Sequence, residues 1–334
     1  MSGMGRREFV ALLGGAAAAW PPAAQAQQSE RVRRVGILVV QAERDAQVQS
    51  NVAMFQRRLA ELGWVKDRNT RFEQRYADGD PERMRTNTAE IIRLKPDVIL
   101  AQNTPMVAVL RQQTTTIPIV FVSVSDPVGD GFVENLARPG GNVTGFANTM
   151  SSLGGKWVEL LKEAAPGVSQ VGYLFNRAVA PGGGAYYLDP LLTAAATLGV
   201  KAVQLELKDA GDIDAVIDGF AATGGNGLIG NSDAFINGNR ERISAAAIRH
   251  RLPTIFANTA SAHAGGLLAY GADTPQMWQA AASYVDRILR GERPNDLPVQ
   301  LPAKFLLVIN LKTARAIGVD IPWFLQQRAD EVIE

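Results

Sequence analysis

The feature that most constrains the fold is a regular alternation of short apolar runs and amphipathic helical segments. Residues 35–40 read Val-Gly-Ile-Leu-Val-Val, an uninterrupted run typical of a strand covered on both faces in a parallel sheet. The next segment spaces its apolar residues alternately by four and three as far as Leu62, which predicts a helix ending near Gly63. Repeated strand–helix units of this kind specify right-handed βαβ connections and a doubly wound α/β sheet.

The alternation continues through most of the chain and is interrupted once. Further strands are predicted at residues 70–76, 97–101, 117–122, 170–175, 201–207, 227–230 and 253–256, with helices between them. Residues 138–145, Arg-Pro-Gly-Gly-Asn-Val-Thr-Gly, break the pattern with three glycines and a proline. We therefore expect two α/β lobes, with the chain crossing from the first to the second just after this segment.

Composition limits the chemistry available to the chain. Lys and Arg total 34 against 33 for Asp and Glu, a formal charge of +1 that leaves no electrostatic footprint for nucleic acid. Cysteine is absent, which excludes thiol nucleophiles, disulfides and Cys-ligated zinc, and His250 and His263 are the two histidines. This composition argues against a catalytic triad or a His-rich metal site. It predicts a protein that binds a ligand rather than an enzyme, without a metal or a cofactor.

The N-terminal segment is typical of an export signal. Two arginines at positions 6 and 7 precede Phe9, and an apolar run extends from there to Trp20. This run is far shorter than the roughly 20 residues of an anchored transmembrane helix. Small residues precede a predicted cleavage after Ala26, so residues 1–26 are interpreted as a signal peptide. The paired arginines favour a twin-arginine signal, with an ordinary secretory signal as the alternative, and both predict a periplasmic protein.

Several sequence blocks resemble one protein family. They are Leu-Gly-Trp-Val at 62–65, Ile-Pro-Ile-Val-Phe at 117–121, Ser-Asp-Pro-Val at 125–128, Leu-Ala-Arg-Pro-Gly-Gly-Asn-Val-Thr-Gly at 136–145, Gly-Gly-Lys-Trp at 154–157, Ser-Tyr-Val-Asp-Arg-Ile-Leu at 283–289, Asn-Leu-Lys-Thr-Ala at 310–314 and Arg-Ala-Asp-Glu-Val-Ile at 328–333. With these blocks, the chain from about residue 33 onward resembles the ABC-transporter substrate-binding proteins of the family that includes tryptophan-binding members. The resemblance implies a type I periplasmic-binding-protein fold, two Rossmann-like lobes with parallel sheets joined by a three-segment hinge.

The resemblance also implies a division of the chain and a function. The N-terminal lobe would comprise residues 33–147 plus about 270–300, and the C-terminal lobe 148–269 plus about 301–334, with Tyr270 where the chain returns to the first lobe. The implied function is extracytoplasmic capture of a small molecule for an ABC importer, by hinge closure, with a membrane permease as partner and the binding protein a monomer. The alternative is a periplasmic solute sensor that passes ligand status to a membrane receptor or kinase.

Candidate binding residues in the first lobe follow from the rule that doubly wound sheets bind ligands at the carboxyl ends of their strands. After the strand at 97–101 come Asn103, Thr104 and Pro105, where Thr104 fits a helix N-cap and Pro105 the first helical position. The free N–H groups there suit a carboxylate, although a plain cap is the alternative. Ser125 and Asp126 follow the next strand, and Asp126 would pair with an ammonium group or form an Asp-Pro turn. These features favour an amino acid as ligand.

Candidates in the second lobe also lie just past predicted strand ends. They are Asn176, Asn231, Asp233, Phe256 and Asn258. We expect them to complete hydrogen bonds when the lobes close, with ordinary turn chemistry as the alternative.

Two further segments bear on the ligand. Residues 258–263 read Asn-Thr-Ala-Ser-Ala-His, a smaller and more polar stretch than many relatives carry, so an aromatic amino-acid ligand does not follow from the resemblance. The glycine-rich segment 181–184 lacks the Lys-Ser/Thr of a phosphate-binding loop. It is predicted to form a flexible surface loop together with Tyr186 and Tyr187, with aromatic residues at the rim of the site as the alternative role of the two tyrosines.

Overall fold

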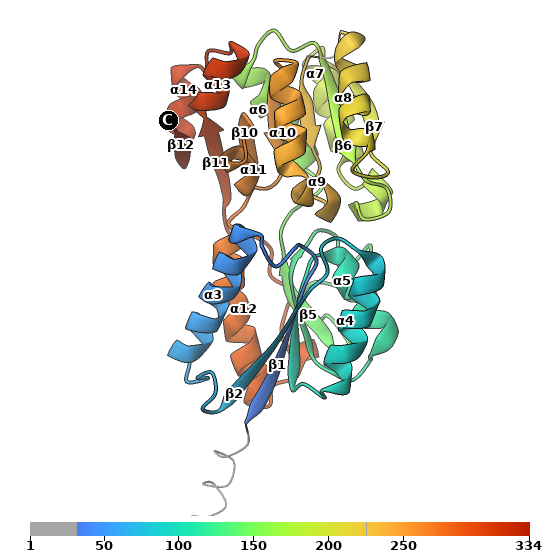
Figure 1. Ribbon diagram of the computed structural model, residues 1–334, viewed down its shortest axis with the longest axis vertical. Coiled ribbons are helices and arrows are strands. Elements are labelled where there is room, and N and C mark those ends of the chain that lie inside the picture. The colour runs from blue at the N-terminus through green and yellow to red at the C-terminus, as the bar shows by residue number, and fades with distance from the viewer. Residues whose placement is uncertain (1–31, 225) are drawn as a thin grey trace, which may run out of the picture.

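The computed structural model describes residues 32–224 and 226–334 and arranges them as two α/β lobes, one above the other along the long axis (Figure 1). The predicted signal peptide lies outside the described residues. Within these two ranges, no helix has both the length and the apolar character needed to cross a membrane.

The first lobe is built on a five-stranded parallel sheet. Its strand order is β2 (Thr70–Tyr76), β1 (Arg33–Val39), β3 (Val98–Gln102), β4 (Ile119–Val124) and β5 (Val143–Ala147). Helices α3 (Ala46–Glu61) and α12 (Thr274–Leu289) pack together on one face, and α4 (Pro81–Arg93) and α5 (Thr104–Gln113) cover the other (Figure 1). Strand β1 lies inside the sheet, as its uninterrupted apolar run predicts.

The amphipathic pattern of the sequence predicts which face of a helix in this lobe is buried. In α3 the stripe that includes Val52, Phe55 and Leu59 is buried against the sheet. The carboxylate of Asp45 caps this helix by accepting a hydrogen bond from the Val48 amide at 3.1 Å. Asp45 is the last residue of the loop between β1 and α3, so this cap positions the start of α3 at the carboxyl end of the sheet.

The second lobe is built on a seven-stranded sheet. Its strand order is β12 (Glu331–Ile333), β11 (Phe305–Asn310), β10 (Leu268–Ala272), β9 (Thr254–Phe256), β8 (Leu228–Gly230), β6 (Gln170–Phe175) and β7 (Lys201–Glu206). Its helices are α6 (Leu153–Ala164), α7 (Leu188–Thr197), α8 (Asp212–Ala222), α9 (Ala234–Gly238), α10 (Arg240–Arg249), α11 (Ala260–His263), α13 (Leu311–Ile317) and α14 (Trp323–Arg328). Neighbouring strands are parallel except β10 and β11, which are antiparallel.

Three segments connect the lobes. They follow β5, follow β10, and precede β11 after a 3-10 turn, η3 (Pro294–Asp296). The first and third lie side by side, because the Gln300 amide donates to the Gly145 carbonyl and the Gln300 carbonyl accepts from the Ala147 amide, both at 2.9 Å. Near the second, the Trp157 indole of α6 donates to the Tyr270 carbonyl at 2.9 Å. These three connections are the hinge between the lobes.

Strand β5 was not predicted from the sequence. The end of the glycine-rich segment continues the first sheet as far as Ala147, and the chain leaves the first lobe after that residue. A glycine is needed there: Gly145 has a φ of +155°, and a Cβ on it would lie 2.2 Å from the Phe121 carbonyl oxygen. Strands β10, β11 and β12 were also missed.

The prediction of a flexible loop around Tyr187 is wrong. Residues Pro181–Gly184 form a 3-10 turn, η2, and Tyr187 is fully buried. Its ring lies 4.8 Å from that of Trp157, centroid to centroid. The glycines in this segment allow the turn to lie close to the core, so a glycine-rich sequence here marks tight packing rather than mobility.

Candidate functional site

A cavity of about 40 Å³ lies between the lobes, at the carboxyl ends of both sheets. The first lobe contributes Gln41, Asp45, Gln102, Asn103 and Ser123 among others, and the second contributes Ser232, Asn237, Arg240 and Asn258. Most of these residues follow strand ends, because the loops at the carboxyl edge of a parallel sheet face the same side. The cavity has room for little more than water, and side chains of both lobes line it.

Two buried side chains that line the cavity have polar atoms with no hydrogen-bond partner among the described residues. They are Gln41, 8% exposed with a free Oε1, and Asn103, 7% exposed with a free Nδ2. Asn231, next to Ser232, is fully buried with both amide atoms free. Asn231 does not line the cavity. A buried unsatisfied polar group costs free energy, so the two amides that do line it are suited to binding a solute that satisfies them.

The backbone beneath the cavity is strained. Asn103 has a φ of 71° and a ψ of 155°, a region used almost only by glycine. Ser123, which also lines the cavity, has a φ of 60° at a bulge in β4. Two such residues on adjacent strand ends are expected where the fold holds side chains for binding.

Direct polar contacts join the lobes across the cavity. Arg240 of the second lobe pairs with Asp45 of the first at 2.8 Å, with side-chain exposures of 17% and 11%. Asn148 donates its Nδ2–H to the Ser232 hydroxyl at 3.1 Å. Asp45 and Arg240 are the two charged side chains among the described residues that line the cavity, and they neutralise each other.

The structure corrects the predicted helix cap in the first lobe. Asn103 occupies the N-cap position of α5, without a side-chain cap bond, and Thr104 and Pro105 are the first two helical residues. Thr104 and Pro105 are half-buried and do not line the cavity. The cap shifts by one residue because Asn103 takes the strained conformation that turns the chain from β3 into α5.

Asp126 lies outside the cavity lining as well. Its carboxylate accepts a hydrogen bond from the Gly129 amide at 2.9 Å, which is the turn that an Asp-Pro sequence favours. The neighbouring Ser125 is buried and contacts the second lobe, with its hydroxyl 3.5 Å from the Ser232 carbonyl oxygen. Of this pair, Ser125 therefore lies nearer to the interlobe contacts.

Of the remaining second-lobe candidates, one lines the cavity and the others make contacts within the protein. Asn258 lines the cavity. Asn176 instead donates to the Leu207 and Lys208 carbonyls at 2.7 and 2.9 Å. Phe256 is a core residue, 1% exposed, and the half-buried Tyr270 ring packs near Phe305, centroid to centroid 5.9 Å. The structure brings together Asn103 and Asn258 from opposite lobes and places Asn176, Phe256 and Tyr270 in supporting roles.

Asp233 is a structural carboxylate. It is 3% exposed and accepts hydrogen bonds from the amides of Ile236 at 2.7 Å and Asn176 at 3.1 Å, so it caps α9 and fixes the end of β6. Burial raises the pKa of Asp233 to about 7, although these amide hydrogen bonds act in the opposite direction. The folded protein therefore holds a proton on Asp233 at mildly acid pH that the unfolded chain releases.

This raised pKa predicts an effect of pH on stability. As pH rises from about 4 to 7 the unfolded state loses this proton first, so the contribution of Asp233 to the free energy of unfolding falls, by about 4 kcal/mol at most. Asp233→Asn should remove this part of the pH dependence. Urea unfolding of both proteins at pH 4.5 and 7.5 measures it, with Asp214→Asn as a control at an exposed carboxylate whose pKa is lowered by Arg242. If the free energy of unfolding of Asp233→Asn changes with pH as much as that of the wild type, the assignment is wrong.

Sequence reasoning missed several lining residues. Gln41 lies two residues past the end of β1, so the expectation that ligands bind at the carboxyl ends of strands applied to it as well as to Asn103. Asp45 and Arg240 gave no such signal, since each begins a helix and they are brought together only by the stacking of the lobes.

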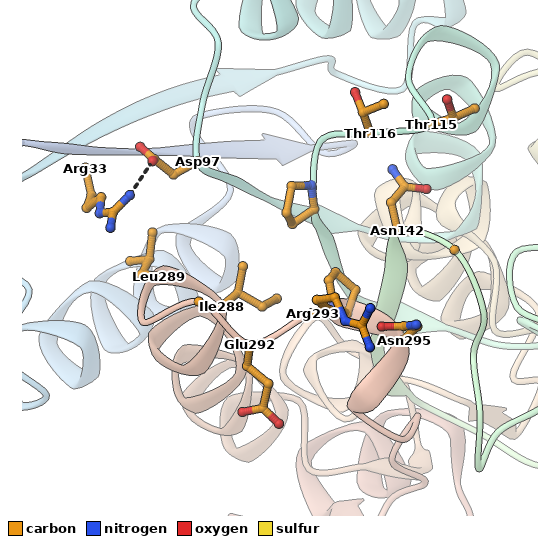
Figure 2. Close-up of a pocket in the computed structure, with 14 residues that line it drawn as sticks. Arg33, Asp97, Thr115, Thr116, Asn142, Ile288, Leu289, Glu292, Arg293 and Asn295 are labelled. Carbon is orange, nitrogen blue, oxygen red and sulfur yellow. Dashed lines mark hydrogen bonds and ion pairs between the residues drawn. The ribbon is translucent and has the colours of Figure 1, made fainter.

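A larger hollow, about 420 Å³, lies at the amino ends of the first-lobe strands, far from the cavity between the lobes (Figure 2). Its Arg33 pairs with Asp97 at 2.9 Å, and Arg293 pairs with Asp296 at 3.0 Å. These charges are satisfied within the protein, and the surface is open. The smaller cavity between the lobes, with its free buried amides, is therefore the stronger candidate site.

Comparisons with known proteins agree with this geometry. The model of the family described as "ABC transporter substrate binding protein" matches residues 35–333. The "Tyrosine-binding protein" of Clostridioides difficile (strain R20291) is 24% identical over 265 residues, which cover 79% of this chain and 75% of that protein.

Solved structures show the same fold. A conserved domain protein from Vibrio cholerae is 28% identical, with a TM-score of 0.82 over 90% of this chain and 100% of that one. An ABC domain in complex with L-Trp from Streptococcus pneumonia is 22% identical, with a TM-score of 0.83 over 90% of this chain and 99% of that one. The two-lobed fold and the family match over nearly the whole described chain lead to one conclusion: this protein belongs to the family of ABC transporter substrate-binding proteins.

Proposed function

We propose that this chain is the extracytoplasmic solute-binding component of an ABC importer. It captures a small polar molecule between its lobes by closing about the three-segment hinge, and the closed form is presented to a permease in the membrane. The observation that carries the proposal is the interlobe cavity, which is lined by side chains of both lobes, including Gln41 and Asn103, each with a buried amide atom that has no partner among the described residues.

Hinge closure is supported by the size of the cavity. A volume of about 40 Å³ is too small for an organic solute to enter, so binding requires the lobes to separate. Contacts such as Asp45 with Arg240 form only when the lobes meet, and a ligand that adds contacts to the closed form shifts the equilibrium toward it. The lining offers no nucleophile paired with a base among the described residues, so we propose binding without catalysis.

The comparisons suggest, but do not fix, the ligand. Two of the similar proteins are described with tyrosine or L-Trp, which makes an amino acid the first class to test. The sensor alternative is not carried forward, because the family is one of transporter proteins. We further propose that residues 1–26 direct export to the periplasm, and that the mature chain is a monomer.

The test uses protein recovered from the periplasm of the expressing cell. Its first residue should be Gln27, and small-angle scattering of ligand-free protein should show a larger radius of gyration than after addition of a binding solute. A thermal-shift screen over amino acids, sugars, polyols, purines and aromatic acids identifies that solute, since binding to the folded state raises the melting temperature. If no compound stabilises the protein and its radius stays constant, the proposed function fails.

A further inference from the structure

We propose that the solute bound between the lobes is uncharged and rich in hydroxyl groups, a polyol or small sugar, and that Gln41 and Asn103 select it. This inference rests on the proposed function and departs from the amino-acid ligands suggested by the relatives. Three observations carry it. The charged side chains of the cavity are paired with each other, the free amide atoms comprise one acceptor and one donor, and none of the described residues that line the cavity is aromatic.

The charged groups of the cavity are already satisfied. Asp45 accepts from Arg240 at 2.8 Å through one oxygen and from the Val48 amide at 3.1 Å through the other. Arg240 also donates to the Asn237 carbonyl at 2.8 Å. An amino acid would need both charges released to meet its carboxylate and ammonium, at the cost of breaking a largely buried pair. A neutral solute leaves the pair in place.

The free amide atoms require a ligand that both donates and accepts. The Gln41 side-chain oxygen is an acceptor and the Asn103 side-chain nitrogen a donor, neither has a partner among the described residues, and each residue is more than nine-tenths buried. A hydroxyl group supplies a donor and an acceptor at one position, so adjacent hydroxyls satisfy both amides in either orientation.

The cavity also lacks a surface for an aromatic ring. Among the described residues that line it, none has an aromatic side chain. Tyr187 is buried against Trp157, and Tyr270 packs near Phe305. Indole and phenol rings bind best against other rings or apolar walls, so amide and hydroxyl side chains are a poor match for them. The amide and hydroxyl side chains of the cavity suit a solute that carries polar groups on all sides.

The experiment starts with protein unfolded in urea and refolded to remove any bound solute. Thermal shift and calorimetry then compare ribitol, xylitol, ribose and glucose with L-Tyr, L-Trp and L-Gln, each at about 5 mM. We expect at least one polyol or sugar to raise the melting temperature by several degrees, and the amino acids to have no effect. An amino-acid ligand without a polyol or sugar ligand overturns this inference and leaves the proposed function standing. A screen in which no compound binds overturns both.

Variants test the residues. Gln41→Leu keeps the size of the side chain and removes its polar atoms, so it should weaken binding of the identified polyol or sugar at least about tenfold. Asn295→Ala is the matched control, because Asn295 also has a buried free oxygen but lines the distant hollow of Figure 2. It should bind with unchanged affinity. If Gln41→Leu binds as tightly as the wild type while remaining folded, the selection assigned to Gln41 is wrong.

Discussion

Gly271→Ala should destabilise the folded protein by about 3 kcal/mol or more. A Cβ built on Gly271 lies 1.7 Å from the carbonyl oxygen and 2.8 Å from the carbonyl carbon of Ala257. Both atoms belong to the backbone just after β9, which pairs with β10 through Leu268 and Ile255. The strands would have to separate to admit a methyl group, and this separation would begin beside the hinge.

Thermal and urea unfolding measure this effect. The matched control is Gly219→Ala, because Gly219 lies inside α8 and a methyl group added there would have nothing within 4 Å of it. There alanine should raise the stability by up to about 1 kcal/mol, since it is the better helix former. A Gly271→Ala protein that melts with the wild type would show that β9 and β10 can separate at little cost.

Arg240→Met should shift the ligand-free protein from the closed to the open form. In the closed form the substitution leaves Asp45 largely buried without its partner, whereas in the open form water solvates it. Breaking a buried pair costs several kcal/mol, and partial exposure reduces this to about 2 kcal/mol, or about thirtyfold in the closed-to-open ratio. Small-angle scattering, or energy transfer between dyes on the two lobes, measures the change.

Two further variants make this test specific. Arg242→Met alters the same helix, but Arg242 pairs with Asp214 of its own lobe at 2.6 Å, so the equilibrium should not change. Asp45→Asn combined with Arg240→Met removes both charges and should restore part of the closed population, since an asparagine side chain can still cap α3. If Arg240→Met and Arg242→Met behave alike, Arg240 does not hold the lobes together.

The parts of the fold that could be predicted are those with a local signal. Strand β2 begins and ends as predicted, and α4 begins at Pro81, because alternation and a proline at the first turn are readable within one segment. Strand β5 was missed because Gly145 weakens its pattern, although the fold needs a glycine there. Strand β12 has only three residues, and β10 contains a glycine, so local periodicity is weak in both; β11 is a longer apolar run that the same criteria could have found.

The site was predictable only in part. The rule of strand ends found Asn103 and Asn258, which line the cavity, and would have found Gln41 had it been applied to the first strand. The same rule selected Asn176 and Asp233, because polar residues past strand ends also serve turns and helix caps. Asp45 and Arg240, 195 residues apart, meet only through the arrangement of the lobes. No local pattern contains that information.

The route of the chain through the two lobes has a consequence for synthesis on the ribosome. The first lobe takes its helix α12 from residues 274–289, and the second takes β11 and β12 from residues 305–333. The first lobe is incomplete until α12 has been made and the second until β12 has been made, so the nascent polypeptide carries the unpaired edge of β10 until β11 emerges. Such edges promote aggregation, and we expect this protein to depend on chaperones while it is being made.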